Sequence, residues 1–167
     1  RAAYRHMGMM AEALAPAIAK VKNIPGDASA PSVTFRTTLN SLLEEHLYVA
    51  TLATAAALGG RQAEFEAAAA LLNTNGTDLG GAIGSLYGDA ARDQWNQIWS
   101  AHNGFFVDYT TGVATKDKAK QDKAVQDLTT IYVPQFSAFL AQATGLPKDA
   151  ISKLVTDHVL QTKAIVD

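Results

Sequence analysis

The sequence predicts an all-α protein, a helical bundle of about six helices. Alanine, leucine and other helix formers dominate its 167 residues, while the valine and isoleucine that a sheet requires are sparse. Large apolar residues recur three and four positions apart in several segments, which is the period of one helix face. A chain of this length typically buries about 70% of its unfolded surface, so it can form a core without a disulfide or a metal.

Three segments share a pattern that ends on a histidine. His46, His102 and His158 each follow large apolar residues placed seven, four and three positions earlier, and consecutive histidines are 56 positions apart. This spacing puts each histidine on the apolar face of its helix. We interpret the pattern as an internal 56-residue helical-hairpin repeat, in which a histidine-bearing helix alternates with a longer helix.

Turn-forming residues divide the chain into its elements. Residues 1–22 form an N-terminal helix that corresponds to the end of a preceding repeat unit, residues 23–32 a linker, and residues 33–167 the helical repeat domain. Gly59-Gly60 and Gly145-Leu146-Pro147 are stop signals between helices. The expected helices cover residues 2–22, 33–58, 61–87, 90–114, 117–144 and 148–166.

Three of these helices contain residues that disfavour a straight helix interior. Pro16 and Pro134 each remove a backbone donor, and Asn75-Gly76 has low helix propensity. We therefore expect a kink or a break at each of these positions.

The composition argues against several classes of function. The absence of cysteine excludes disulfides, thiolate metal sites and cysteine nucleophiles. A net charge of −2 with scattered basic residues argues against a nucleic-acid partner. No apolar run approaches the roughly 20 residues of a transmembrane helix. The known hydrolase, zinc-protease and phosphate-binding motifs do not occur, so we do not expect an enzyme.

The repeat histidines are the main candidates for chemistry. His46, His102 and His158 converging from packed helices would form an open site for copper, with zinc or haem iron as alternatives. Alternatively, each is a core histidine that packs on aromatic rings. Glu45 and Asp157 directly precede two of the histidines, but adjacent helical residues point about 100° apart. They could therefore act on the histidines only through another helix.

The N-terminal helix carries a second candidate metal site. His6, Met9 and Met10 stand at i, i+3 and i+4, which would bring one imidazole and two thioethers together as soft ligands for Cu(I). Alternatively, the methionines fill gaps in a core. The same helix has an apolar stripe that includes Leu14 and Ile18 and must be buried somewhere. We therefore expect this helix to pack either against another chain, which would be self-association, or across the two repeats.

Two motifs and a longer segment carry a resemblance to known proteins. A Leu-Leu-x-Glu-His motif ends at His46, a Tyr-x-His-Met-x-Met motif covers residues 4–9, and residues 99–109 form a third match. Together they resemble a group of secreted, poorly characterised bacterial helical proteins, some of them attached to copper amine oxidase-type N-terminal domains. The resemblance implies an extracytoplasmic setting, and it makes the candidate histidines and methionines recurrent positions of the family. It implies no established activity.

Two functions remain open from the sequence. The first is an extracytoplasmic metal-binding helical bundle, with copper favoured over zinc or haem. The second is a structural, self-assembling helical repeat module of an extracellular filament or surface layer, since a repeat buries its apolar face only against neighbours.

Overall fold

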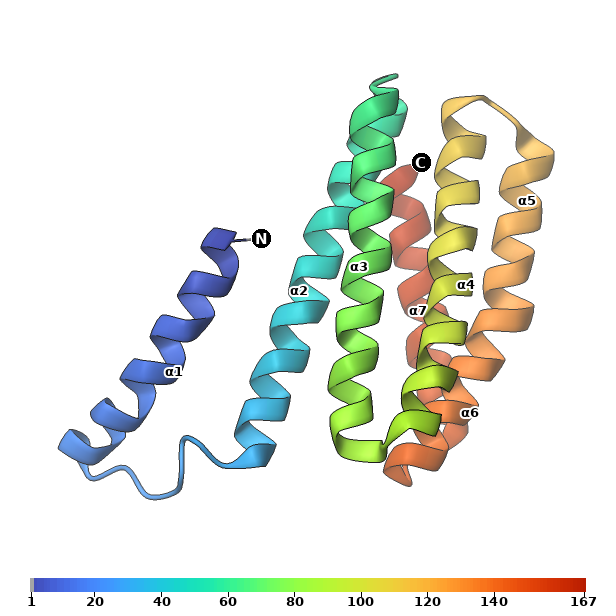
Figure 1. Ribbon diagram of the computed structural model, residues 1–167. Helices are drawn as coiled ribbons and strands as arrows, with labels where there is room; N and C mark the ends of the chain where they lie inside the picture. The colour runs from blue at the N-terminus through green and yellow to red at the C-terminus, as the bar shows by residue number, and fades with distance from the viewer. Residues whose placement is uncertain (1) are drawn as a thin grey trace. The chain divides into compact units, whose positions relative to one another are not determined.

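The computed structural model describes residues 2–167, with side chains from His6 onward. It is helical over 88% of the chain, and the described residues contain no strand (Figure 1). The all-α prediction is confirmed, and each predicted boundary lies within two residues of the observed one. The elements are α1 (Ala2–Lys22), α2 (Pro31–Leu58), α3 (Gln62–Tyr87), α4 (Asp89–Ala114), α5 (Lys118–Asp127), the π-helical turn η1 (Leu128–Tyr132), α6 (Val133–Thr144) and α7 (Lys148–Val166).

The chain divides into two compact units. Unit 1 extends to Glu44 and contains α1, the linker and the first half of α2, while unit 2, Glu45–Asp167, contains the rest of α2 and the helices that follow. No residue from Pro31 to Glu44 is buried. The boundary between the two units therefore lies inside α2, and the predicted division into an N-terminal helix, a linker and a repeat domain stays a prediction.

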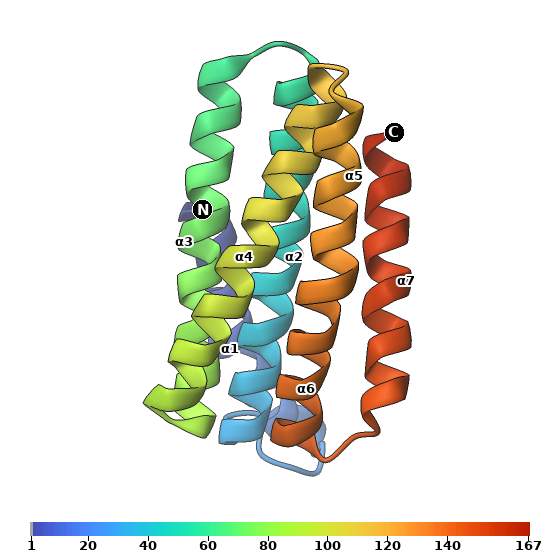
Figure 2. The same cartoon turned by 90° about the vertical axis from the view of Figure 1, so that its right-hand side faces the viewer.

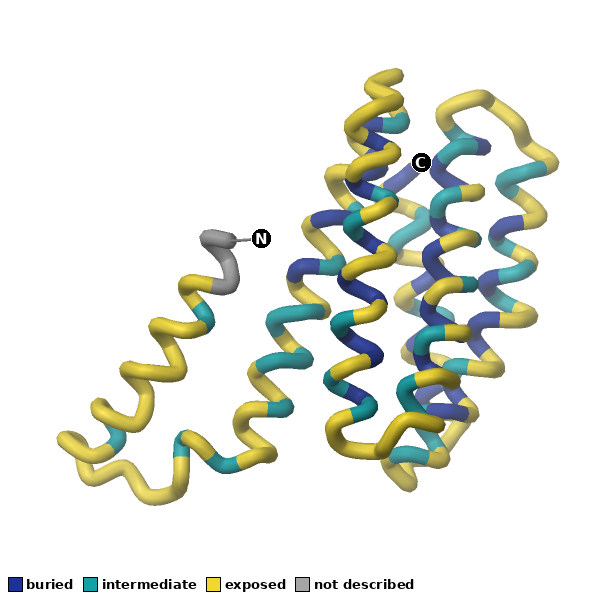
Figure 3. The backbone as a smooth tube through the Cα atoms, in the orientation of Figure 1, coloured by how far each residue is buried: buried dark blue, intermediate teal, exposed yellow. Residues whose placement is uncertain are grey.

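Unit 2 is a bundle in which α4 packs against α3 and α5, while α6 packs against α7. These helices lie side by side along a common direction (Figure 2). Their buried residues face the interior of the unit and alternate with exposed ones at helical spacing (Figure 3). One part of the core is an apolar cluster that includes Val49, Leu72, Phe106, Tyr109 and Val166.

Helix ends follow the predicted stop signals. The helix α2 ends at Leu58, directly before Gly59-Gly60. The helix α6 ends at Thr144, and Gly145 then adopts the left-handed conformation with φ of 72°, which glycine tolerates without strain. At the start of α5, the Asp117 carboxylate accepts a hydrogen bond from the Lys120 backbone N–H at 3.0 Å.

The residues that disfavour a helix interior affect their helices differently. The π-helical turn η1 ends two residues before Pro134, so the regular α-helix is interrupted near the predicted position, although the chain stays helical. In α3 the helix continues without interruption through Asn75-Gly76, and α1 continues through Pro16. No break in the helix therefore marks these last two positions.

None of the helices in the described part of the chain combines the length and the hydrophobicity needed to cross a membrane.

Candidate functional site

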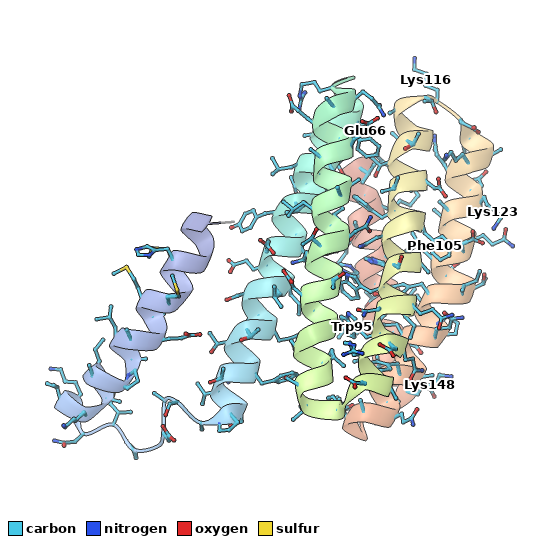
Figure 4. The ribbon with its side chains drawn as sticks, viewed as in Figure 1. Glu66, Trp95, Phe105, Lys116, Lys123 and Lys148 are labelled. Atoms are coloured by element: carbon cyan, nitrogen blue, oxygen red, sulfur yellow. The ribbon has the colours of Figure 1, made fainter. Side chains whose placement is uncertain are left out.

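The candidate site of unit 2 is built around His102. On α4, Trp95, Trp99 and His102 stand at i, i+4 and i+7, so helix geometry places them on one face. Trp95 is labelled in Figure 4. The two indoles stack with centroids 4.7 Å apart, and the Trp99 ring lies 5.1 Å from the His102 ring. We use the name histidine–aromatic cluster for His46, Trp95, Trp99, His102, Tyr132 and Phe136.

The segment formed by η1 and α6 contributes two rings to this cluster. The Tyr132 ring lies 4.5 Å from the His102 ring and stacks on Phe136 at 5.2 Å. Phe136 also contacts Trp95 in an edge-to-face arrangement at 5.5 Å. Tyr132 and Phe136 are four positions apart and so share a helix face. The cluster therefore joins α4 to the chain on both sides of Pro134.

His46 brings α2 into the cluster. Its ring centroid is 5.8 Å from that of His102 and 5.1 Å from that of Trp99. Its Nδ1 atom lies 3.2 Å from Oδ1 of Asn75 on α3. Because an amide oxygen only accepts hydrogen bonds, Nδ1 is the donor and carries the proton. The other ring nitrogen, Nε2, therefore keeps the lone pair that a metal ion would require.

Asn75 also links His46 to the preceding residue, Glu45. The Nδ2 group of Asn75 donates a hydrogen bond to Oε2 of Glu45 at 2.9 Å. Glu45 is 8% exposed and Asn75 is completely buried, at 0%. Two adjacent residues of α2 thus contact a single side chain of α3. Asn75 therefore provides a link between Glu45 and His46 through another helix, and a role of Glu45 at a metal site stays a prediction.

Burial keeps the imidazole rings neutral. Desolvation lowers the pKa of His46 from 6.5 to about 4, although the hydrogen bond to Asn75 opposes this shift. Desolvation, reinforced by repulsion from His46 and His158, lowers the pKa of His102 from 6.5 to about 3. The same burial raises the pKa of Tyr132. At pH 7 the rings are therefore in the form that packs well on aromatics and can also bind a metal.

His158 occupies a more open position on α7. His158 is exposed, whereas His102 is buried and His46 is partly buried. The predicted inward orientation therefore holds for His46 and His102, while His158 lies at the edge of the interior. Together with His102 it lines a cavity of about 30 Å³ whose other walls are mostly apolar. The buried part of its surface lowers the pKa of His158. The cavity has room for one water molecule or one small ion.

The second predicted metal site lies on α1, in unit 1. His6, Met9 and Met10 fall within one continuous helix, so the predicted i, i+3, i+4 arrangement forms. All three side chains are exposed, Met9 by 60% and Met10 by 44%. The methionines therefore do not fill a core within unit 1.

The described side chains include no group of three histidine or carboxylate residues placed closely enough to hold one metal ion. What the site offers is the pair His46 and His102, with His158 on the far side of His102, where these last two residues line the cavity. The structure also adds residues that the sequence analysis did not select as candidates for the site. Asn75 is a polar residue in an otherwise apolar stripe, and Tyr132 and Phe136 form an i, i+4 aromatic pair; both are weak signals for buried positions.

Comparison with protein-family models, with curated proteins and with solved structures found no match to this chain.

Proposed function

We propose that the chain is a structural module that assembles with copies of itself through α1. The observation that carries the proposal is the state of this helix in unit 1, where no side chain from His6 to Lys22 is buried. Its apolar stripe lies on one helix face, and the large members of the stripe are between 44% and 76% exposed. An apolar surface of this kind marks an interaction site. Its large residues are Met10, Leu14, Ile18 and Val21.

The acceptor that we propose is an exposed, partly apolar face on α7 of a second copy. Leu154, His158 and Ile165 are four and seven positions apart, which places them on one helix face. Leu154 is 71% exposed and Ile165 is 68% exposed. Each copy would thus offer a donor stripe on α1 and an acceptor face on α7. A contact between two different surfaces is heterologous and builds rings or open filaments, which fits an extracellular filament or surface layer.

The strength of this contact can be bounded. Complete burial of one large apolar side chain contributes about 1.5–3 kcal/mol, so the four large stripe residues supply on the order of 6–12 kcal/mol. Lost translational and rotational freedom costs roughly 4–15 kcal/mol. The most favourable combination leaves a surplus of about 8 kcal/mol, so we expect weak association, no tighter than the micromolar range.

The histidine–aromatic cluster has a structural role in this proposal, since it ties α2, α4 and the η1 turn together. The extracytoplasmic setting is part of the same proposal and rests on the family resemblance of the motifs at His6 and His46.

Light scattering across a concentration series tests the assembly. The wild-type mass should rise above that of one chain with concentration, and the double variant Leu14→Glu/Ile18→Glu should remain monomeric. Ala19→Glu is the matched control, because it adds a charge to α1 about 140° around the helix from Leu14. A monomeric wild type at every concentration would contradict the proposal and would indicate that α1 packs on its own chain.

The lack of native cysteine allows a direct test of the two surfaces. A mixture of one protein carrying Ile18→Cys and another carrying Leu154→Cys should form a disulfide-linked heterodimer under mild oxidation. Replacing the second partner with Lys153→Cys, which is also exposed on α7 but lies one position off the acceptor face, should give much less product. Equal yields would exclude the α7 face as the acceptor.

A second candidate function is the binding of a single copper ion by His102 together with His46 and His158. It is favoured by one observation, the 5.8 Å separation of two neutral imidazole rings that come from different helices. The cavity of about 30 Å³ beside His102 suits an ion and not a haem group. His6, Met9 and Met10 form a separate soft site in this proposal. Titration with Cu(I), Cu(II), zinc and haem tests it.

A further inference from the structure

All three methionines of the chain lie close together on α1. They are Met7, Met9 and Met10, and their side chains are 62%, 60% and 44% exposed. Figure 4 draws sulfur, in yellow, only on this helix. Methionine usually fills gaps in apolar cores and binding surfaces. Here, in contrast, every thioether of the chain is open to solvent.

Helix geometry separates the three methionines into two sets. Met7 and Met10 stand three positions apart, and Leu14 follows four positions after Met10, so these residues share one helix face. Met7 therefore extends the apolar stripe of α1 toward its N-terminus. Met9 lies five positions before Leu14, which is about 140° around the helix. Two methionines thus belong to the stripe, and the third lies outside it.

The methionines are the groups that a mild oxidant reaches most readily. The chain has no cysteine, and its two tryptophans, Trp95 and Trp99, are only 3% and 5% exposed. A peroxide reacts with a thioether by transferring one oxygen atom. A sulfur lone pair attacks a peroxide oxygen, the O–O bond breaks as the S–O bond forms, and the proton on the transferred oxygen passes to the departing hydroxide to give water. Sulfur loses two electrons to the peroxide, and the product is methionine sulfoxide.

We propose that Met7 and Met10 are oxidation sites, and that their conversion to sulfoxides by a peroxide separates the α1 stripe from the second copy. The proposal rests on the assembly through α1 that is proposed above. A thioether is apolar, whereas a sulfoxide carries a polar oxygen. Burial of this oxygen in the contact removes its hydration, and the apolar part of the acceptor face, Leu154 and Ile165, has no side-chain donor to replace the lost water. Because sulfoxide reductases restore the thioether, the change is reversible.

Light scattering of the full chain before and after treatment with dilute hydrogen peroxide tests the proposal, with the intact mass as the measure of the oxygen atoms added. Oxidation of the wild type should weaken association at least about tenfold, because polar oxygens then lie in the contact. Treatment with methionine sulfoxide reductases should restore association. The unfolding temperature at monomeric dilution should stay the same, because unit 2, Glu45–Asp167, contains no methionine. This measurement separates a lost contact from a damaged fold.

Two variants assign the effect to the stripe. Met9→Leu keeps both stripe methionines and should lose association on oxidation as the wild type does. The double variant Met7→Leu/Met10→Leu keeps an apolar stripe, because leucine has a volume similar to that of methionine, and it should associate equally before and after oxidation.

Two results would overturn the proposal and leave the assembly standing. One is a loss of association in the oxidised double variant, and the other is an oxidised wild type that associates as strongly as the untreated protein. A wild type that is monomeric before treatment would instead overturn the assembly and this proposal together.

Discussion

The imidazole rings of His46 and His102 lie 5.8 Å apart, at a tilt of 34°, with the Trp99 ring 5.1 Å from each. Two residues 56 positions apart in the sequence thus form one triangle of rings across α2 and α4. Burial forces both imidazoles to remain neutral in the folded chain, whereas both can take up a proton when the chain unfolds. This difference makes the stability of unit 2 depend on pH.

We predict that stability falls as the pH is lowered from 7 to 5. The folded pKa values of about 4 and about 3 lie below the ordinary value of 6.5, so the unfolded chain binds more protons in this range. Linkage then costs about 2 kcal/mol for each of the two histidines over the two pH units. Urea unfolding at pH 7, 6 and 5 measures the change.

The variant His102→Phe should reduce this pH dependence by about half, because it keeps an aromatic ring in the cluster and removes one titrating group. His158→Gln is the control, because His158 is exposed on α7 and a smaller change in slope is expected. A slope unchanged by His102→Phe would mean that other groups dominate the acid sensitivity.

Asn75 is expected to be one of the most sensitive positions of unit 2. It is fully buried and contacts both the His46 ring and the Glu45 carboxylate. Asn75→Ala leaves these groups without that partner in a buried setting, which should destabilise the fold by about 2–4 kcal/mol. Asn73→Ala, at an exposed position two residues earlier, should change stability by less than about 0.5 kcal/mol. Chemical unfolding of both variants at pH 7 measures the difference, and similar losses in the two would contradict the role given to Asn75.

The helix bounds could be predicted from the sequence, whereas the partners of the histidines could not, and the difference has a physical basis. Helix bounds follow from local signals such as Gly145 and Asp117, which act within one or two turns and can be found in the sequence. The partners of the histidines depend on how separate helices pack. In the predicted repeat, position 131 is equivalent to Asn75, which contacts His46, and would be expected to contact His102. The residue that contacts His102 is Tyr132, one position later. A π-helical turn accommodates one extra residue, and η1, at Leu128–Tyr132, explains a shift of one position. The repeat itself stays a prediction.

Replacing two glycines of α3 by alanine should change the stability of the fold in opposite directions. A Cβ on Gly76 would meet the buried Trp99 ring at 2.7 Å, whereas a Cβ on Gly81 would meet nothing within 4 Å. Gly76→Ala should therefore destabilise the fold by about 1–3 kcal/mol through overpacking. Gly81→Ala should stabilise it by up to about 1 kcal/mol through helix propensity. Thermal unfolding of the two variants measures both changes in stability. If both variants were stabilised, the packing between α3 and α4 would be shown to adjust to the added methyl group.

The metal candidate makes the last prediction. If copper binds at the histidine–aromatic cluster, Cu(I) should raise the unfolding temperature of the wild type, because a ligand that binds only the folded state stabilises it. His102→Ala should weaken binding at least about tenfold, or roughly 1.4 kcal/mol. The triple change of His6, Met9 and Met10 to alanine should abolish only a separate binding event on α1. Calorimetric titration with Cu(I), Cu(II), zinc and haem distinguishes these cases. If no metal or haem stabilises the wild type, His46 and His102 are core residues alone, because neutral rings packed on Trp99 and Tyr132 need no ion to account for their burial.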